Sequence, residues 1–316
     1  MPGPLEGLLV VALEQAVAAP FCTMRLADAG ARVFIQNLKP GAIDRIGYPV
    51  DQLCASNPRL IACSISGYGE TGPMAARKAY DLLVQAESGL ASITGGPSEA
   101  SRVGFSIVDI ATGAVAAQSI MEALYGRSSS GRGTHIKLSM FDTIVEWMAV
   151  PFLHAAYGRP PKRVGLAHPS IAPYGVFSAC DGRQILISIQ NEREWEQLCT
   201  RVLQEPALLR DERFATNVAR VEHRAETDGE VAARFGAIES SELVAHLTEA
   251  DIAFAFVNEL EDLLRHSQLQ TVSVRTPAGP AELPSPAPRW TTFPRSYGAV
   301  PALGEATETV RREFGL

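Results

Sequence analysis

The sequence has few cysteines, and their arrangement gives no support to two kinds of site. The chain of 316 residues contains five of them, an odd number, scattered and without a C-x-x-C spacing. Neither structural zinc nor a disulfide framework is indicated by such a pattern. We expect free thiols in a reducing cytoplasm at all five positions: Cys22, Cys54, Cys63, Cys180 and Cys199.

Three further absences narrow the class of protein. The net charge is −7, and there is no basic patch of the kind that nucleic-acid-binding proteins need. We find no apolar run long enough to span a bilayer and no basic-then-apolar leader. The glycine fingerprint G-x-G-x-x-G is missing from the first turn, so a dinucleotide site has little support. The sequence predicts a cytoplasmic protein without nucleic-acid or membrane partners.

Short apolar runs alternate with helical segments in the first half of the chain. Leu8–Leu13 is a continuous apolar run, typical of a strand buried on both faces. A helix is expected over Pro20–Ala29, ended by Gly30, and further strands over Ala31–Ile35 and Leu60–Ser66. This alternation favours an α/β fold with a parallel sheet that binds ligands at its strand ends.

One apolar stretch carries a single charge. Between Val103 and Ala117 the only charged residue is Asp109. Apolar residues recur at spacings of three and four, which predicts a buried helix: Ile107, Ile110, Ala114, Ala117, Met121 and Leu124. A carboxylate near the start of such a helix is costly to bury and needs backbone N–H groups or the helix dipole. Two interpretations stay open, an N-terminal cap and a nucleophilic or acid–base carboxylate.

After this helix we expect a loop over Ser128–Gly133, a strand over Thr134–Leu138 and one helix over Met140–Ala156. Trp147 on that helix is expected in the core. Most histidines have no ligand spacing and are expected as surface or capping residues: His135, His223, His246 and His266.

The second half predicts a smaller α+β domain. Tyr157–Pro169 is rich in glycine, proline and charge, as in a linker. A hairpin is expected from Ala172–Phe177 and Gln184–Ile189. A mostly helical pattern follows over residues 205–250, and a proline-rich segment over Thr276–Pro294 leads to a short closing helix.

Several motifs, in their order and intervals, resemble the class III CoA-transferases, the formyl-CoA transferase and carnitine CoA-transferase family. They are K-A-Y-D-L-L-V-Q-A-E-S-G-L (Lys78–Leu90), T-G-G-P (Thr94–Pro97) and G-R-G-T-H-I-K-L-S-M-F-D (Gly131–Asp142). The likeness runs from Leu5 to nearly the C-terminus. It places Asp109 at the family's nucleophilic aspartate, and it implies a coenzyme A thioester as substrate with no metal or redox cofactor.

The resemblance also implies a coenzyme A pocket. From the residues alone, Q-N-L-K-P-G-A-I-D-R (Gln36–Arg45) is a strand end, a turn and a helix start, which presents N–H groups to an anion. The family holds coenzyme A with the matching stretch. The residues carried over are Asn37, Leu38, Ala42 and Arg45, joined by Lys78, Tyr80 and Asp81. Tyr80 also favours the transferases, because the family's racemase branch has a histidine there.

The chain departs from the family at one place. Relatives have several dozen residues between the G-A-R-V strand and the Q-N-L-x-P-G turn, whereas this chain runs from Val33 directly to Phe34. A parallel crossover needs about a dozen residues or more, so two strands are fused or one is lost, with part of the pocket. Three functions therefore stay open: a transferase, an acyl-CoA racemase or isomerase, and a non-catalytic coenzyme A-binding relative.

The resemblance extends to substrate and assembly. The stretch Gly158–Phe177 looks most like the branch that handles mesaconate, itaconate, citramalate and succinate. Arg163 and His168 are the candidates for a second carboxylate; the alternative is a solvated Arg163 and a monocarboxylate pocket. Oxyanion donors are expected in Ser66–Gly72 or Gly165–Ser170. The family forms interlocked homodimers, and we expect one here.

The resulting domain prediction has four parts. Residues 1–157 form a large, apparently shortened, Rossmann-like domain that binds coenzyme A, and 158–175 form a linker. Residues 176–250 form the small α+β domain, and 251–316 return to pack on the large domain.

Overall fold

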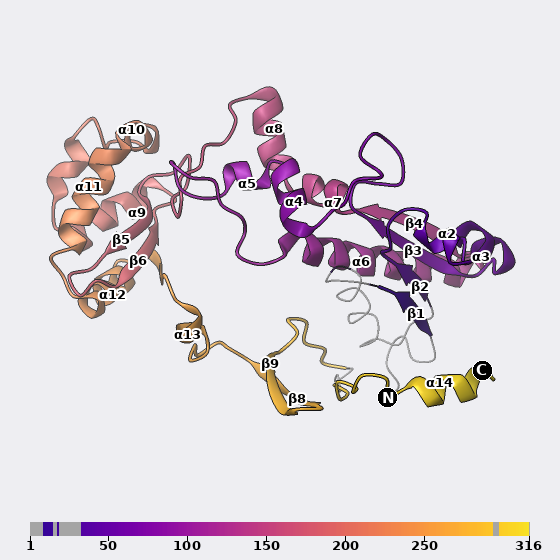
Figure 1. The fold of residues 1–316 in the computed structure, drawn as a ribbon. Helices are drawn as coiled ribbons and strands as arrows, with labels where there is room; N and C mark the ends of the chain where they lie inside the picture. The colour runs from indigo at the N-terminus through magenta and orange to yellow at the C-terminus, as the bar shows by residue number, and fades with distance from the viewer. Residues whose placement is uncertain (1–8, 15–17, 19–32, 293–296, 316) are drawn as a thin grey trace. The chain divides into compact units, whose positions relative to one another are not determined.

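The computed structural model describes residues 9–14, 18, 33–292 and 297–315 (Figure 1). The chain forms two compact units, and each is described by itself. The first unit comprises residues 1–88, 104–149 and 263–316, and the second comprises 89–103 and 150–262. These boundaries differ from the predicted ones because units follow spatial contacts rather than composition. Residues 89–103 belong with the second unit, and the expected return segment 251–316 is divided between the two.

The first unit contains a parallel sheet, as predicted. The strands that the structure describes in it lie in the order β1 (Val10–Leu13), β2 (Val33–Gln36), β3 (Ile61–Ser66) and β4 (Thr134–Ser139), and every neighbouring pair is parallel. Strand β2 crosses the Val33–Phe34 junction without interruption and pairs with β1 and β3. The fused-strand interpretation of the shortening is therefore favoured. The helix expected over Pro20–Ala29, with Gly30, lies outside the described residues.

Alternate side chains of the sheet point to opposite faces. On one face, Gln36, Ser64 and Lys137 are register partners or neighbours across β2, β3 and β4 and line a pocket. Residues between them, such as Ile35 and Ile65, are fully buried. The long helix α6 (Ile107–Ser130) packs against β3 and β4.

The helix expected around Asp109 is confirmed as α6, but its ends and buried face differ from the prediction. It continues to Ser130 and stops at Gly131, whose φ of 70° ends the helix, so a loop beginning at Ser128 was wrong. The buried side is rotated by about one position, and Met121 is exposed. The residues buried are Val108, Ala111, Thr112, Gly113, Ala116, Ala117, Ile120 and Leu124. Because α6 is apolar nearly all round, periodicity alone does not select its inner face.

Helix α6 also bears on the membrane prediction. By length and composition it could cross a bilayer, so it corrects the expectation that no apolar stretch is long enough. Core helices pass the same test, and α6 packs on the sheet.

The single helix expected over Met140–Ala156 is two helices, α7 (Met140–Trp147) and α8 (Ala149–Tyr157). Pro151 explains the break, because its ring opposes the carbonyl of Trp147, four residues earlier. Trp147 is 54% exposed, so its expected place in the core was wrong.

The remaining elements of the first unit are short. They are α2 (Ala42–Arg45), α3 (Val50–Ser56), α4 (Asp81–Glu87), the hairpin β8 (Thr271–Thr276) and β9 (Gly279–Pro284), and α14 (Thr307–Phe314). The closing helix is confirmed. The hairpin was missed because its prolines, Pro280 among them, were interpreted as a tail.

The second unit has an antiparallel sheet in the order β5 (Tyr174–Ser178), β6 (Gln184–Ser188) and β7 (Ala253–Phe256). The predicted hairpin is thus confirmed. The helical elements are α5 (Leu90–Ile93), α8, α9 (Glu192–Gln197), η1 (Leu198–Val202), η2 (Pro206–Arg210), α10 (Asn217–Glu222), α11 (Arg224–Phe235), α12 (Ser240–Glu249) and α13 (Leu260–Leu263), the last at its boundary. The core joins the sheet to these helices through residues such as Ile187, Trp195 and Phe235.

The close packing of the backbone at Gly133 against the backbone at Leu60 can be tested by mutation. A Cβ on Gly133 would lie 1.9 Å from the carbonyl oxygen of Leu60. We expect Gly133→Ala to lower the free energy of unfolding by about 3 kcal/mol, because backbone must move. Gly126, inside α6, has open space around its Cβ position. Gly126→Ala should stabilise by up to about 1 kcal/mol. Urea denaturation measures both; equal stabilities would contradict the packing described.

Candidate functional site

The N-terminus of α6 is capped by a residue from another helix. Asp81, the first residue of α4, is buried, and its Oδ2 accepts hydrogen bonds from the N–H groups of Val108 (2.8 Å) and Asp109 (3.1 Å). Its Oδ1 accepts one from Gln85 Nε2 (2.5 Å). Ser106, at the N-cap position, makes no capping bond with its side chain. Asp81 therefore supplies the negative charge that the start of a helix favours.

Asp109 lies in the first turn of α6 and is half-buried, but its carboxylate has a different environment. No hydrogen bond to that carboxylate forms within the described part of the chain. Burial, followed by the negative charge of Asp81, raises its pKa from 3.8 to about 6. A capping role was one of the two interpretations of Asp109 from the sequence, and in the structure Asp81 has that role. A carboxylate that is partly desolvated, has no hydrogen bond from the described residues and has a shifted pKa is a candidate for a functional site.

Lys78 and Tyr80 precede α4 and are both exposed. Tyr80 is the N-cap residue of α4, with extended backbone. The structure thus brings Asp81 and Asp109 together, and Lys78 and Tyr80 lie just before the start of α4. The binding roles that the resemblance gave to Lys78, Tyr80 and Asp81 stay predictions.

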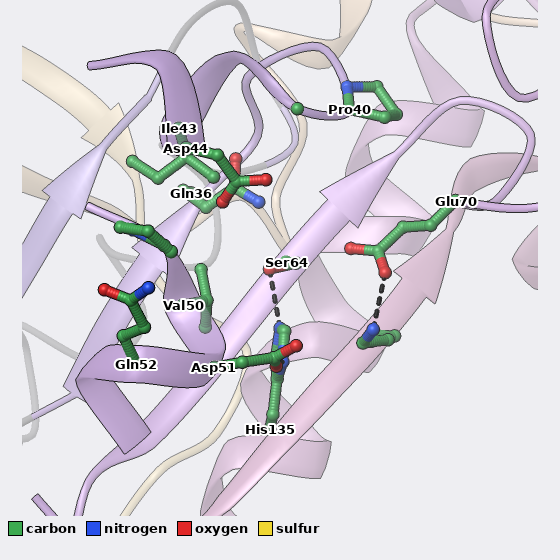
Figure 2. Close-up of a pocket in the computed structure, with 13 residues that line it drawn as sticks. Gln36, Pro40, Ile43, Asp44, Val50, Asp51, Gln52, Ser64, Glu70 and His135 are labelled. Atoms are coloured by element: carbon green, nitrogen blue, oxygen red, sulfur yellow. Dashed lines mark hydrogen bonds and ion pairs between the residues drawn. The ribbon is translucent and has the colours of Figure 1, made fainter. Parts of the chain in front are cut away.

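A pocket of about 450 Å³ opens where β2 ends and α2 begins (Figure 2). The turn at Gly41 has φ 76°, a conformation that favours glycine. Residues of this turn line the pocket: Gln36, Pro40, Gly41, Ile43 and Asp44. The predicted residues are their sequence neighbours and are absent from the lining: Asn37, Leu38, Ala42 and Arg45. Their contact with coenzyme A stays a prediction.

Figure 2 also shows polar contacts that sequence reasoning missed. His135 Nε2 lies 2.8 Å from Ser64 Oγ, and its Nδ1 lies 3.3 Å from Asp51 Oδ1. Lys137 pairs with Glu70 at 2.7 Å. The His135 side chain is only 14% exposed, so the expected surface position was wrong. Alternating polar residues in T-H-I-K-L-S were the available signal, but contacts to β3 depend on strand register.

The Ser64–His135–Asp51 contacts have the residue types of a hydrolase triad but not its environment. Ser64 is 3% exposed, too enclosed for an attacking hydroxyl, whereas the Asp51 side chain is 87% exposed. The working triad has the reverse arrangement, with a buried carboxylate. We assign this cluster to the pocket wall. Among the described residues, no group of three or more His, Cys, Asp or Glu side chains is placed to hold a metal ion.

Arg163 and His168 lie in the second unit. Arg163 donates from Nε to the carbonyl of Gly96 (3.1 Å) and from Nη1 to that of Ser92 (2.9 Å). It is therefore not the freely solvated charge of the alternative interpretation. His168 stacks on Tyr174, with ring centroids 5.3 Å apart. Asp109 belongs to the first unit, so the role of these residues at a substrate stays a prediction.

The two candidate oxyanion loops use some of their N–H groups internally. Gly69 N–H donates to Ser66 Oγ (3.1 Å), and Gly165 N–H donates to the carbonyl of Gly95 (2.9 Å). Neither loop is distinguished from the other on this ground.

Comparison with known proteins supplies the family. A model described as CoA-transferase family III matches residues 31–307. A succinate–glutarate CoA-transferase of Agrobacterium fabrum is 34% identical over 247 residues, which are 78% of this chain and 61% of that protein. The chain thus spans less than two thirds of that relative in the matched region.

Two further matches extend over the whole chain. An acetyl-CoA:oxalate CoA-transferase of Acetobacter aceti is 30% identical over 378 residues, covering 99% of this chain and 96% of that protein. Since this chain has 316 residues, the relative contains residues with no counterpart here, in agreement with the predicted shortening. The crystal structure of a CAIB/BAIF family protein from Brucella suis has a TM-score of 0.85 and 29% identity, covering 99% of this chain and 100% of that one.

These matches agree with the parallel sheet and with the family resemblance of the sequence motifs. The chain belongs to CoA-transferase family III.

Proposed function

We propose that the chain transfers coenzyme A from an acyl-CoA to a free short-chain carboxylic acid, with Asp109 as the nucleophile. One observation carries the proposal. The Asp109 carboxylate is half-buried and accepts no hydrogen bond from the residues that the structure describes, while Asp81 accepts those of the N–H groups of Val108 and Asp109. The family supports the reaction class.

The chemistry follows from a carboxylate nucleophile. Asp109 attacks the thioester carbonyl, a mixed anhydride forms, and the C–S bond breaks to release coenzyme A thiolate. The thiolate then attacks the aspartyl carbonyl, which gives an aspartyl thioester and frees the first acid. The acceptor carboxylate displaces coenzyme A to form a second anhydride, and the thiolate returns to the acyl carbonyl. The new acyl-CoA leaves and Asp109 is regenerated, so no metal or redox cofactor is required.

Two alternatives are tested by the same assay. Racemase or isomerase activity is disfavoured by Tyr80 in place of histidine, and a non-catalytic role is suggested by the shortening at Val33–Phe34. The protein is incubated with succinyl-CoA and a panel of acids and analysed by mass spectrometry. New acyl-CoA species indicate a transferase, altered stereochemistry a racemase, and a folded but silent protein a binder.

The acceptor we propose is a dicarboxylate. The two relatives above are named for succinate, glutarate and oxalate, all of which carry two carboxylates. A second carboxylate needs a donor away from the nucleophile, and charge-assisted bonds are the strongest available. Arg163 and His168 are the proposed residues. We further propose an interlocked homodimer in the cytoplasm.

Loss of the nucleophile gives the first functional test. We expect Asp109→Ala to abolish exchange, because the covalent intermediates cannot form. The fold should persist, since alanine is a good helix residue and the cap belongs to Asp81. Turnover is followed by chromatography of acyl-CoA products, and trapped adducts by mass spectrometry of the Asp109 peptide. Retained turnover would refute the assignment.

The same carboxylate predicts a pH-dependent stability. The pKa of Asp109 is raised to about 6 in the folded chain against 3.8 for the ordinary group. The folded state therefore binds this proton more tightly, and the carboxyl destabilises the fold as the pH rises through that window. At pH 8, Asp109→Asn should be more stable than wild type by about 1 kcal/mol after solvent screening, or about 2–4 °C in Tm. Calorimetry at pH 8 and below pH 4 measures the gain, which should vanish in acid.

Asp81 gives a complementary test. Its negative charge contributes to the raised pKa of Asp109, so Asp81→Asn should lower that pKa. Since the nucleophile must be ionised, the acid limb of the pH–rate profile should move to lower pH. Glu122→Gln, on the exposed side of the same helix, is the control and should leave the limb in place. An unmoved limb in a folded Asp81→Asn protein would contradict the coupling.

Acceptor selectivity tests the substrate class. Loss of a charge-assisted bond costs about 1.5–3 kcal/mol, so Arg163→Ala or His168→Ala should raise KM for glutarate about tenfold or more. KM for butyrate should change little. His266→Ala is the matched control, since that ring also accepts from the N–H two residues on. Equal rates with the two acids, or unchanged selectivity in both variants, would count against a dicarboxylate site.

A further inference from the structure

The turn from His168 to Ala172 is held by side chains of α10 and α11. Arg224 Nη2 donates to the carbonyls of His168 (2.7 Å) and Ile171 (2.6 Å). Asn217 donates to the carbonyl of Ser170 (3.0 Å) and accepts from the N–H of Ala172 (3.1 Å). Buried Arg220 donates to the carbonyl of Ala172 (2.8 Å). The backbone of this turn is therefore fixed along most of its length.

The imidazole of His168 is fixed with it. Its Nδ1 accepts from the N–H of Ser170 (3.2 Å), and its ring stacks on Tyr174 at an interplanar angle of 15°. Because a backbone N–H can only donate, the neutral ring carries its proton on Nε2. No partner of that Nε2 lies among the described residues. His168 thus presents one hydrogen-bond donor from an oriented ring.

Arg224 contacts this turn more closely than it contacts its ion-pair partner Asp228. Its Nη1 forms an ion pair with Asp228 Oδ2 at 3.8 Å, beyond hydrogen-bond distance, and is buried with no hydrogen-bond partner in the described part of the chain. Its short bonds go to the two carbonyls that flank the turn. Both bonds come from one nitrogen, Nη2, whose two N–H groups have directions fixed by the planar guanidinium. A lysine ammonium is a point charge on a flexible side chain and does not fix the direction of its donors in this way.

We infer that Arg224 is a positioning residue for acceptor recognition, acting through His168: it holds the turn so that Nε2–H of His168 donates to the second carboxylate of the acid. Arg224 itself does not touch the substrate. The inference rests on the proposed function for its substrate, and on the contacts above for its mechanism.

The test uses the full chain labelled with ¹⁵N-histidine and the variants Arg224→Gln and Arg224→Lys. Long-range ¹H–¹⁵N spectra should show the Nε2–H tautomer at His168 in wild type and a mixture of tautomers in Arg224→Gln. Adding glutarate should shift His168 Nε2 in wild type and not in the variant. His266 is an internal reference. Arg201→Gln, which removes an arginine–carbonyl bond to Glu249 in the same unit, is the matched control.

Kinetics supply the second readout. We expect Arg224→Gln to raise KM for glutarate about tenfold, with kcat and the KM for butyrate within twofold of wild type. Arg224→Lys should fall between the two, and Arg201→Gln should match wild type. A general loss of structure would instead change both acceptors alike.

Three results would overturn the inference: a wild-type tautomer in folded Arg224→Gln, no glutarate shift at wild-type His168, or equal changes for both acceptors. If Arg224→Gln does not fold, Arg224→Lys decides, and wild-type behaviour in it overturns the inference. If wild type shows no transfer at all, the proposed function fails, while the tautomer and the glutarate shift still decide on Arg224.

Discussion

The first unit depends on one interaction, the acceptance of two N–H groups of α6 by the carboxylate of Asp81. That contact joins the starts of α4 and α6, which are 27 residues apart at Val108. It also divides two acids into different roles. Asp81 accepts three hydrogen bonds, whereas the carboxylate of Asp109, in the first turn of α6, accepts none from the described residues and has a raised pKa. When the environments of two neighbouring carboxyl groups differ in this way, the two groups can take different chemical roles.

The shortened sheet keeps the elements that hold this arrangement. β2 continues through the Val33–Phe34 junction, and the order β1-β2-β3-β4 follows the chain. The helix bearing Asp109 packs on β3 and β4, which lie beyond the junction in the sequence. Parallel sheets are ordinarily covered on both faces. Here one face carries Gln36, Ser64 and His135 around a pocket, a polar lining suited to a ligand rather than to a packed helix.

Much of the fold could be predicted from local pattern, and the site only in part. The strands, the hairpin of the second unit and helix α6 follow from short-range apolar runs and turns. The inner face of α6 could not be predicted. A helix that is apolar on nearly all sides can bury any of them, and the elements it packs against decide which side is buried. The cap by Asp81 and the contact of Ser64 with His135 join residues far apart in sequence, so no local signal encodes them. Motif resemblance pointed to Asp109, but the half-buried environment of its carboxylate is a tertiary property.

Two of the proposed functional groups, Asp109 and His168, share one feature: the polar groups beside them are hydrogen-bonded within the chain. Around Asp109, the helix N–H groups are taken by Asp81; at His168, Nδ1 is taken by Ser170 while Nε2 has no partner among the described residues. For the half-buried carboxylate of Asp109, burial disfavours the charged form, as its raised pKa shows. Arg220 differs, because its buried guanidinium is bonded to Ala172, Phe214 and Glu192. Arg220 thus bonds within the fold, whereas the roles that we propose for Asp109 and His168 need a partner from outside it.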